Sequence, residues 1–138
     1  MSDDLLLDTC AIIWIALNQP MRPEAVAAMN RSFAAEQRVR VSPISAWELG
    51  LLSAKGRLPT VRAPMDIFGE TITTPGVRIE ALSPEVLVEA SFLPGRLHRD
   101  PADRILIATA RRFGLTLVTR DQIILDYANQ GHLRALAC

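Results

Sequence analysis

The chain has 138 residues with 15 basic and 15 acidic side chains, so its formal net charge is zero. A chain of this length is expected to form one domain over residues 1–138, and 49% hydrophobic with 22% charged residues is typical of a globular protein. Zero net charge argues against nucleic-acid binding through overall basicity, although a local basic face is compatible with it.

The first half of the chain predicts two short strands and four helices. Leu5–Leu7 is an apolar run of the kind found in strands that are buried on both faces. Ser42 is an N-cap followed by Pro43 at the first helical position, and Pro23 is placed in the same way. In chain order we expect a strand at 5–7, helices over 10–17 and 23 to about 37, a strand at 39–41, and helices over 43–55 and 64–74.

The second half predicts three strands and three helices. Asp100 precedes Pro101 as an N-cap, and Gly114 ends the helix that follows. In chain order we expect a strand at 77–82, helices over 84 to about 93 and over 101–113, a strand at 115–119, a helix over 121–127 and a strand at 133–137. Strands that alternate with helices indicate an α/β fold whose central parallel sheet has helices on both faces.

The cysteines and the apolar runs predict a cytoplasmic protein without a membrane segment. Cys10 and Cys138 match neither the spacing of a metal site nor a disulfide framework, so a reducing compartment is expected. The longest apolar stretch, residues 5–17, is interrupted by Asp8 and is too short to span a membrane. The acidic N-terminal residues also differ from the positively charged start of a signal peptide.

Two acids follow predicted strands. Asp8 ends the first apolar strand, and Asp121 comes directly after the strand at 115–119. Because parallel strands place their C-terminal ends at one edge of the sheet, where open α/β sheets bind ligands, the two side chains are expected to converge. The alternative is that each acid begins a turn or caps the next helix, and this alternative is the simpler one for Asp121 taken alone.

A third acid, Glu48, falls inside the apolar arc of its predicted helix. With Ile44 as the origin of a helical wheel, Glu48 lies between Leu51 and Leu52. A buried carboxylate costs several kcal/mol unless it is paired, protonated or bound to a cation. Glu48 is therefore a candidate metal ligand, and an ion pair with an arginine of a neighbouring element is the alternative.

Asp100 and Asp103 have different expected roles. Asp100 is most simply the N-cap of the helix that begins at Pro101. Asp103 stands at the third helical position, where a carboxylate interacts favourably with free N–H groups and with the helix dipole. That interaction explains its residue type, but the other acids nearby keep Asp103 a candidate ligand.

Asp8, Glu48, Asp103 and Asp121 together would form a cluster of like charges that needs a divalent cation. Oxygen ligands with no nearby pair of Cys or His favour Mg²⁺ (or Mn²⁺) over Zn²⁺. Such a site is typical of enzymes that cleave phosphodiester bonds. Residues 96–112 hold five arginines against two aspartates, next to His98, and we name Arg99 and Arg104 as RNA-contact candidates. The alternative is an ordinary solvated helix face.

These acids lie in segments that resemble PIN-domain ribonucleases, specifically the VapC toxins of bacterial VapBC toxin–antitoxin pairs. The matching segments follow the order of the family and span nearly the whole chain: LLLDTC at 5–10, ISAWE at 44–48, HRDPADR at 98–104 and LVTRD at 117–121. The resemblance implies a three-layer α/β/α PIN-like fold with a central parallel sheet. It also implies endonuclease activity on single-stranded RNA.

The resemblance further assigns roles and partners. It implies that Asp8, Glu48, Asp103 and Asp121 hold the metal and its attacking water, with the Thr9 and Thr119 hydroxyls as supporting groups beside them. It implies a homodimer and a cognate VapB-type antitoxin whose C-terminal segment blocks the site. Apolar residues between 10 and 17 would help to line the antitoxin groove, although core packing explains them equally: Ile13, Trp14 and Leu17.

Other classes of protein fit the residues less well. A phosphatase of the haloacid dehalogenase type needs a second Asp two positions after Asp8, where this chain has Cys10. A response-regulator receiver domain needs a late lysine after a strand, and Lys55, the only lysine, stands elsewhere. An RNA-processing PIN nuclease without a toxin role and a non-catalytic interaction module are the remaining alternatives.

Overall fold

A computed structural model of the chain describes residues 4–35, 38–97 and 99–138, and these residues form a sheet of five strands. The strand order is β3-β2-β1-β4-β5, and every pairing is parallel. The strands are β1 (Leu5–Leu7), β2 (Val39–Val41), β3 (Val77–Ile79), β4 (Thr116–Thr119) and β5 (Arg134–Ala137). The predicted central parallel sheet is confirmed.

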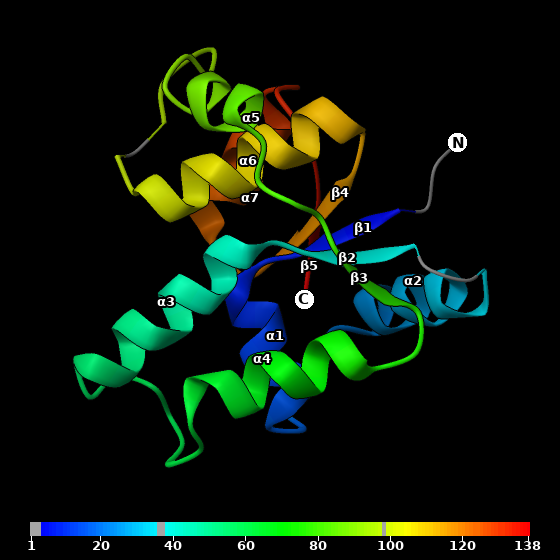
Figure 1. The fold of residues 1–138 in the computed structure, drawn as a ribbon. Coiled ribbons are helices and arrows are strands. Elements are labelled where there is room, and N and C mark those ends of the chain that lie inside the picture. The colour runs from blue at the N-terminus through cyan, green and yellow to red at the C-terminus, as the bar shows by residue number, and fades with distance from the viewer. Residues whose placement is uncertain (1–3, 36–37, 98) are drawn as a thin grey trace.

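Helices cover both faces of this sheet (Figure 1). The described residues contain seven: α1 (Thr9–Ala16), α2 (Pro23–Ala34), α3 (Pro43–Ala54), α4 (Pro64–Thr73), α5 (Pro84–Glu89), α6 (Pro101–Phe113) and α7 (Gln122–Asn129). In the view of Figure 1, α5, α6 and α7 lie above the sheet, and α1, α2 and α4 lie below it. This arrangement confirms the three-layer α/β/α fold.

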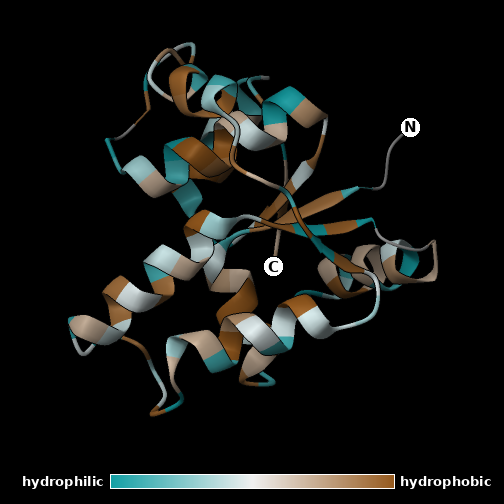
Figure 2. Cartoon of the chain, viewed as in Figure 1, coloured by the Kyte–Doolittle hydropathy of each residue, from teal (hydrophilic) through white to brown (hydrophobic). Residues whose placement is uncertain are grey.

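The strand β1 lies at the centre of the core, which explains its uninterrupted apolar sequence. Leu5 and Leu7 point to one face and pack in a cluster with residues of α1, α2, α3 and α4. Leu6 points to the other face and packs against α6 and α7. In Figure 2 the hydrophobic residues accordingly gather along the central strands. A strand buried on both faces has no polar positions, so alternation is absent.

Most of the predicted boundaries are confirmed, because prolines and caps mark them. Ser42 accepts a hydrogen bond from the Ile44 N–H and caps α3, and Asp100 caps α6. Gly114 ends α6 in the left-handed conformation at φ 65°, which glycine adopts without a steric cost. No helix in the described ranges is long and apolar enough to cross a membrane.

Three predicted elements are shorter than expected. The strand predicted at 77–82 ends at Ile79, because its one partner β2 ends at Val41, whose carbonyl accepts the last hydrogen bond from Glu80. The helix predicted to reach about 93 ends at Glu89, and short turns follow it before Pro94. Helix α2 ends at Ala34, before the predicted end near 37, and residues 36 and 37 lie outside the described part of the chain.

Candidate metal centre

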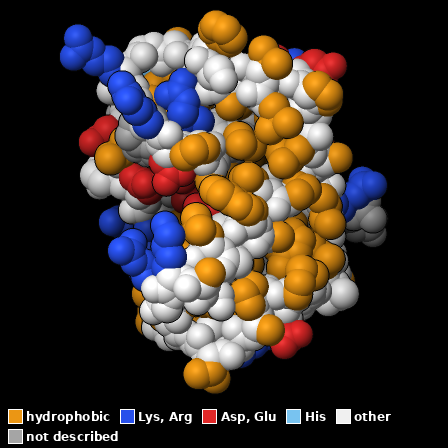
Figure 3. Space-filling view, turned by 60° about the vertical axis from the view of Figure 1, so that its left-hand side comes forward, with side chains coloured by type: hydrophobic (Ala, Val, Ile, Leu, Met, Phe, Trp, Pro, Cys, Tyr) orange, Lys and Arg blue, Asp and Glu red, His pale blue; other side chains and the backbone are white. Residues whose placement is uncertain are grey.

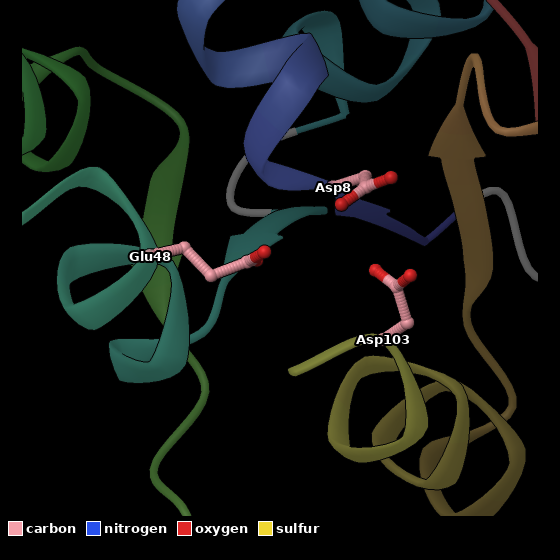
Figure 4. A group of neighbouring side chains, drawn as sticks. All are labelled: Asp8, Glu48 and Asp103. Carbon is pink, nitrogen blue, oxygen red and sulfur yellow. The ribbon is translucent and has the colours of Figure 1, made fainter. Parts of the chain in front are cut away.

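Three acids from three different elements converge at the C-terminal edge of the sheet (Figure 4). Asp8 follows β1, Glu48 belongs to α3, and Asp103 lies in the first turn of α6. Each of these side chains offers one carboxylate oxygen, and the three oxygens lie within 4.8 Å of one another. The fold therefore assembles a cluster from residues that are up to 95 positions apart in the chain.

Asp8 is held in one orientation by three donors. Its Oδ1 accepts a hydrogen bond from the Thr9 N–H at 2.7 Å, which makes Asp8 the N-cap of α1. Its Oδ2 accepts from the Thr119 hydroxyl at 2.6 Å and from the Cys10 thiol at 3.4 Å. The sequence left two roles open for Asp8, a helix cap and a ligand-binding acid. The structure is compatible with both, because Asp8 caps α1 and also belongs to the acid cluster.

Glu48 lies in the cluster without an arginine partner. Its Oε1 accepts a hydrogen bond from the Thr9 hydroxyl at 2.5 Å, and the same hydroxyl is 2.9 Å from the Oγ of the fully buried Ser45. Among the described residues no ion pair involves Glu48. The alternative of an ion pair with a neighbouring arginine is therefore not supported.

Asp100 and Asp103 occupy the positions that their spacing predicts. Asp100 is the N-cap of α6, and its Oδ1 accepts a hydrogen bond from the Asp103 N–H at 3.2 Å. Asp103 is 8% exposed and points into the cluster, whereas Asp100 is exposed at the cavity wall. The capping interaction therefore also fixes the backbone of the residue that carries the inner carboxylate.

Asp121 stands at the edge of this group and is not one of the three clustered acids. It is the N-cap of α7, with Oδ1 accepting from the Ile123 N–H at 2.8 Å, and its own N–H donates to Thr119 Oγ1 at 3.1 Å. It nevertheless lines the cavity with the other acids. Thr119 connects the two strand-end acids, because the same hydroxyl contacts both Asp8 and Asp121.

Burial and mutual repulsion make the cluster hold protons tightly in the absence of a cation. Burial, and then the charges of Asp8 and other nearby acids, raises the pKa of Asp103 to about 8. Burial likewise raises the pKa of Glu48 to about 7, against the opposing effect of the Thr9 hydrogen bond. The pKa of Asp8 is also raised, mainly by burial, although three hydrogen bonds oppose this effect. These shifts are those expected of a site built around positive charge.

The donor set fits a hard divalent cation. A cavity of about 410 Å³ opens onto the acids, and its lining contains carboxylates, one thiol and one guanidinium: Asp8, Thr9, Cys10, Ile13, Glu48, Leu52, Asp100, Asp103, Arg120 and Asp121. Among the described residues, the cluster consists of three carboxylate oxygens with no imidazole, which matches the preference of Mg²⁺ or Mn²⁺. We therefore take the cluster as a candidate metal centre held by Asp8, Glu48 and Asp103.

The two arginines named from the sequence occupy different environments. The Arg104 Nε donates to the Ala90 carbonyl at 2.8 Å and so joins α6 to the end of α5. Arg99 is exposed just before α6. His98, which stands next to Arg99 in the sequence, lies outside the described residues.

Sequence reasoning missed two features of this site. Arg120 lines the cavity, stacks over the Trp14 ring at 4.1 Å and donates to the Pro20 carbonyl at 2.7 Å. Its position between two predicted site residues was the signal that could have found it. The thiols of Cys10 and Cys138, which look unrelated in sequence, influence each other's pKa beside Asp8: the interaction raises the pKa of Cys10 and lowers that of Cys138. Only the sheet order β1-β4-β5 brings them together, so their spacing carried no signal.

A three-layer fold with an acid cluster at the C-terminal edge of its sheet is the architecture of a PIN domain. Residues 5–130 match the model of this family, and the chain belongs to the PIN-domain family. It is similar to the protein named Ribonuclease VapC22 of Mycobacterium tuberculosis. The two are 31% identical over 121 residues, which cover 86% of this chain and 87% of that relative.

Solved structures share the fold at lower sequence identity. The VapBC2 structure from Rickettsia felis, bound to a promoter DNA fragment, matches with a TM-score of 0.67 and 14% identity, over 96% of this chain and 97% of that one. The DNA-bound VapBC from Salmonella typhimurium matches with 0.64 and 17%, over 99% and 98%. VapC20 of Mycobacterium tuberculosis, described as a toxin that cleaves the sarcin-ricin loop, matches with 0.58 and 20%, over 94% and 96%.

Proposed function

We propose that this protein is a Mg²⁺-dependent (or Mn²⁺-dependent) endoribonuclease that cleaves single-stranded RNA and acts as the toxin of a VapBC pair. The convergence of Asp8, Glu48 and Asp103 in one cavity is the observation that carries the proposal. The similarity to a ribonuclease named VapC22 supports RNA as the substrate. The proposal takes residues 1–138 as one nuclease domain located in the cytoplasm.

The residues of the cavity divide the chemical work. A bound divalent cation would supply Lewis-acid activation of the phosphodiester and of the attacking water. Asp8, Glu48 and Asp103 would hold that cation, and the Thr119 and Thr9 hydroxyls keep Asp8 and Glu48 in position through hydrogen bonds. In this proposal Asp121, at the cavity edge, orients the water through its second carboxylate oxygen. No further protein nucleophile is needed.

Basic side chains near the acids would attract the RNA backbone. Figure 3 shows Asp and Glu side chains grouped on one face, with Lys and Arg side chains on two sides of them. This local distribution would allow a chain of zero net charge to bind a polyanion such as RNA. Of the two arginines named from the sequence, the exposed Arg99 is the better placed, because the Arg104 side chain contacts the Ala90 carbonyl.

A partner chain is part of the proposal. The VapBC structures that share this fold are complexes of a VapC with its VapB, and we propose a VapB-type antitoxin and a homodimer for this chain as well. Ile13 of α1 belongs to the core and also borders the cavity, so it offers apolar contact to a segment that blocks the site. Leu17 packs against the same core cluster, as the alternative explanation required.

Removal of the metal is expected to abolish the activity. The purified protein should cleave a labelled single-stranded RNA in Mg²⁺ or Mn²⁺ and should lose this activity in EDTA, because no cation is then present to activate the phosphodiester and the attacking water. Gel analysis of the products, with restoration by excess Mg²⁺ as the control, measures the effect. Undiminished cleavage in EDTA would contradict the metal-dependent mechanism.

Expression in a bacterial host is expected to arrest growth. The proposed reaction destroys RNA, so wild-type protein should stop growth within a few generations, and co-expression of the antitoxin from the neighbouring reading frame should relieve the arrest. The matched control is Asp8→Asn at the same protein level. A PIN nuclease without a toxin role would cleave RNA in vitro and yet leave growth unaffected by the neighbouring gene.

A further inference from the structure

A second cavity of about 230 Å³ lies directly beside the metal centre. It runs between α3 and the start of α6, and we call it the Trp47 groove after the one aromatic residue among the described residues of its lining. Its lining comprises Trp47, Glu48, Leu51, Leu52, Lys55, Arg57, Asp100, Pro101 and Ala102. Three of these residues, Glu48, Leu52 and Asp100, also line the metal cavity, so the two cavities share one wall. A chain bound in one of them would continue into the other.

Trp47 presents an aromatic surface to solvent at this wall. Its side chain is 53% exposed, and Leu51, one helical turn later, is 36% exposed. Trp47 immediately precedes the clustered Glu48 in α3, and both residues line the groove beside the metal centre. Core packing does not explain the Trp47 indole, because about half of this residue is exposed to solvent. Large exposed apolar groups gathered in a groove are instead typical of binding sites.

The far end of the groove is basic. Lys55 follows the last residue of α3, Arg57 comes two residues later, and both are exposed. Within the described ranges neither side chain takes part in an ion pair. The acids of the groove, Glu48 and Asp100, lie on the wall shared with the metal cavity. Along the groove the lining therefore changes from the carboxylates beside the metal centre to the Trp47 indole and then to the cations of Lys55 and Arg57.

We infer that the Trp47 groove binds a nucleotide of the single-stranded RNA next to the bond that is cleaved. Its base stacks on the Trp47 indole, and Lys55 and Arg57 contact the adjoining phosphate. Aromatic stacking combined with a basic track is the general means by which proteins bind single-stranded nucleic acids. This inference rests on the proposed ribonuclease function, and it deepens that function by naming where the substrate lies.

The fluorescence of Trp47 allows a direct test. The chain has two tryptophans, so a Trp14→Phe variant reports on Trp47 alone, and a Trp47→Phe variant reports on Trp14. An unstructured RNA of about 12 nucleotides, titrated in EDTA at low salt so that it stays intact, should quench the Trp47 signal. The same RNA with abasic nucleotides should not quench it, because it keeps the phosphates and has no base to stack.

Kinetics provide the second arm of the test. In Mg²⁺, Trp47→Ala is expected to raise KM for the RNA about 10-fold, with kcat changed less than about 3-fold and Tm retained, since the indole binds substrate away from the reacting atoms. Trp47→Phe should restore most of the loss. A double Lys55→Ala and Arg57→Ala variant should raise KM and reduce its dependence on salt. Phe92→Ala, which removes an aromatic residue that is 80% exposed outside both cavities, is the matched control.

The possible outcomes separate this inference from the function on which it rests. No cleavage by the wild type in Mg²⁺, together with quenching of Trp47 by RNA, would refute the nuclease and support the groove as an RNA site. Normal cleavage with an unchanged KM in Trp47→Ala and no quenching would overturn the groove and leave the nuclease standing. Unchanged cleavage by Trp47→Ala that the antitoxin no longer inhibits would assign the groove to the antitoxin and would likewise overturn the inference.

Discussion

Replacement of Asp103 by asparagine is expected to reduce RNA cleavage by at least about 100-fold, which exceeds the loss usually caused by groups that only support a metal ligand. The same replacement at Asp100 is expected to leave most of the activity. The two acids are three positions apart and belong to the same helix start, but Asp103 is buried in the cluster and Asp100 is exposed at its wall. Asn caps a helix nearly as well as Asp, so Asp100→Asn keeps the hydrogen bond from the Asp103 N–H.

Initial rates of cleavage of a labelled single-stranded RNA at saturating Mg²⁺ would measure this difference. Circular dichroism and the melting temperature of each variant would show that the fold is retained. Asp126→Asn, an exposed acid on α7 that does not line the metal cavity, is the matched control and should behave as wild type. Equal losses in Asp100→Asn and Asp103→Asn would show that the division into a cap and a ligand is wrong.

The fold was predictable because its signals are local. Helix boundaries are marked by proline at the first helical position, by a Ser or Asp cap before it, and by Gly114 after α6. Each of these signals acts within a few residues, so the helix boundaries can be read from the local sequence. The strand at 5–7 was identifiable for a different reason, since three consecutive leucines suit a strand that is covered on both faces. The end of β3 was not predictable, because it depends on where its neighbour β2 stops.

The site was predictable in part, because strand ends and helical periodicity indicate where its acids lie. Asp8 and Asp121 follow strands that pair at one edge, and Glu48 interrupts an apolar arc, so topology and periodicity both pointed to the cavity. The finer arrangement depends on distances that a sequence does not contain. The Oδ1 of Asp121 accepts hydrogen bonds from two backbone N–H groups of α7. Cys138 lies near Cys10 because the sheet order β1-β4-β5 places the ends of β1 and β5 on either side of β4.

The metal-free protein is expected to lose stability as the pH rises from about 5 to about 8. In the unfolded chain Asp103 releases its proton near its ordinary pKa of 3.8, whereas in the folded chain its pKa is about 8. Between these values the folded state binds more protons than the unfolded state, so the free energy of unfolding falls with pH, and the fall ends above about pH 8. For each extra proton bound, the slope is at most about 1.4 kcal/mol per pH unit.

Asp103→Asn is expected to flatten this slope and to stabilise the metal-free protein near neutral pH, because Asn is neutral without the proton that Asp103 must take up when the chain folds. Asp8→Asn should gain less, because Asn offers one acceptor oxygen where the Asp8 carboxylate accepts from Thr9, Cys10 and Thr119. Mg²⁺ should stabilise the wild type instead. With a dissociation constant on the order of 1 mM, about 10 mM Mg²⁺ adds roughly 1.4 kcal/mol, a rise in Tm of about 4–8 °C.

Thermal melts of wild type, Asp8→Asn and Asp103→Asn, in EDTA and in Mg²⁺ between pH 5 and pH 8, would measure the whole pattern. The Mg²⁺ effect on the wild type should grow with pH, because the cation competes with the protons that Glu48 and Asp103 hold at lower pH. The Asn variants should respond to Mg²⁺ much less, since each has lost a charged ligand. Variants that melt lower than wild type in EDTA and respond fully to Mg²⁺ would identify these acids as structural caps, and a shared metal site would then be wrong.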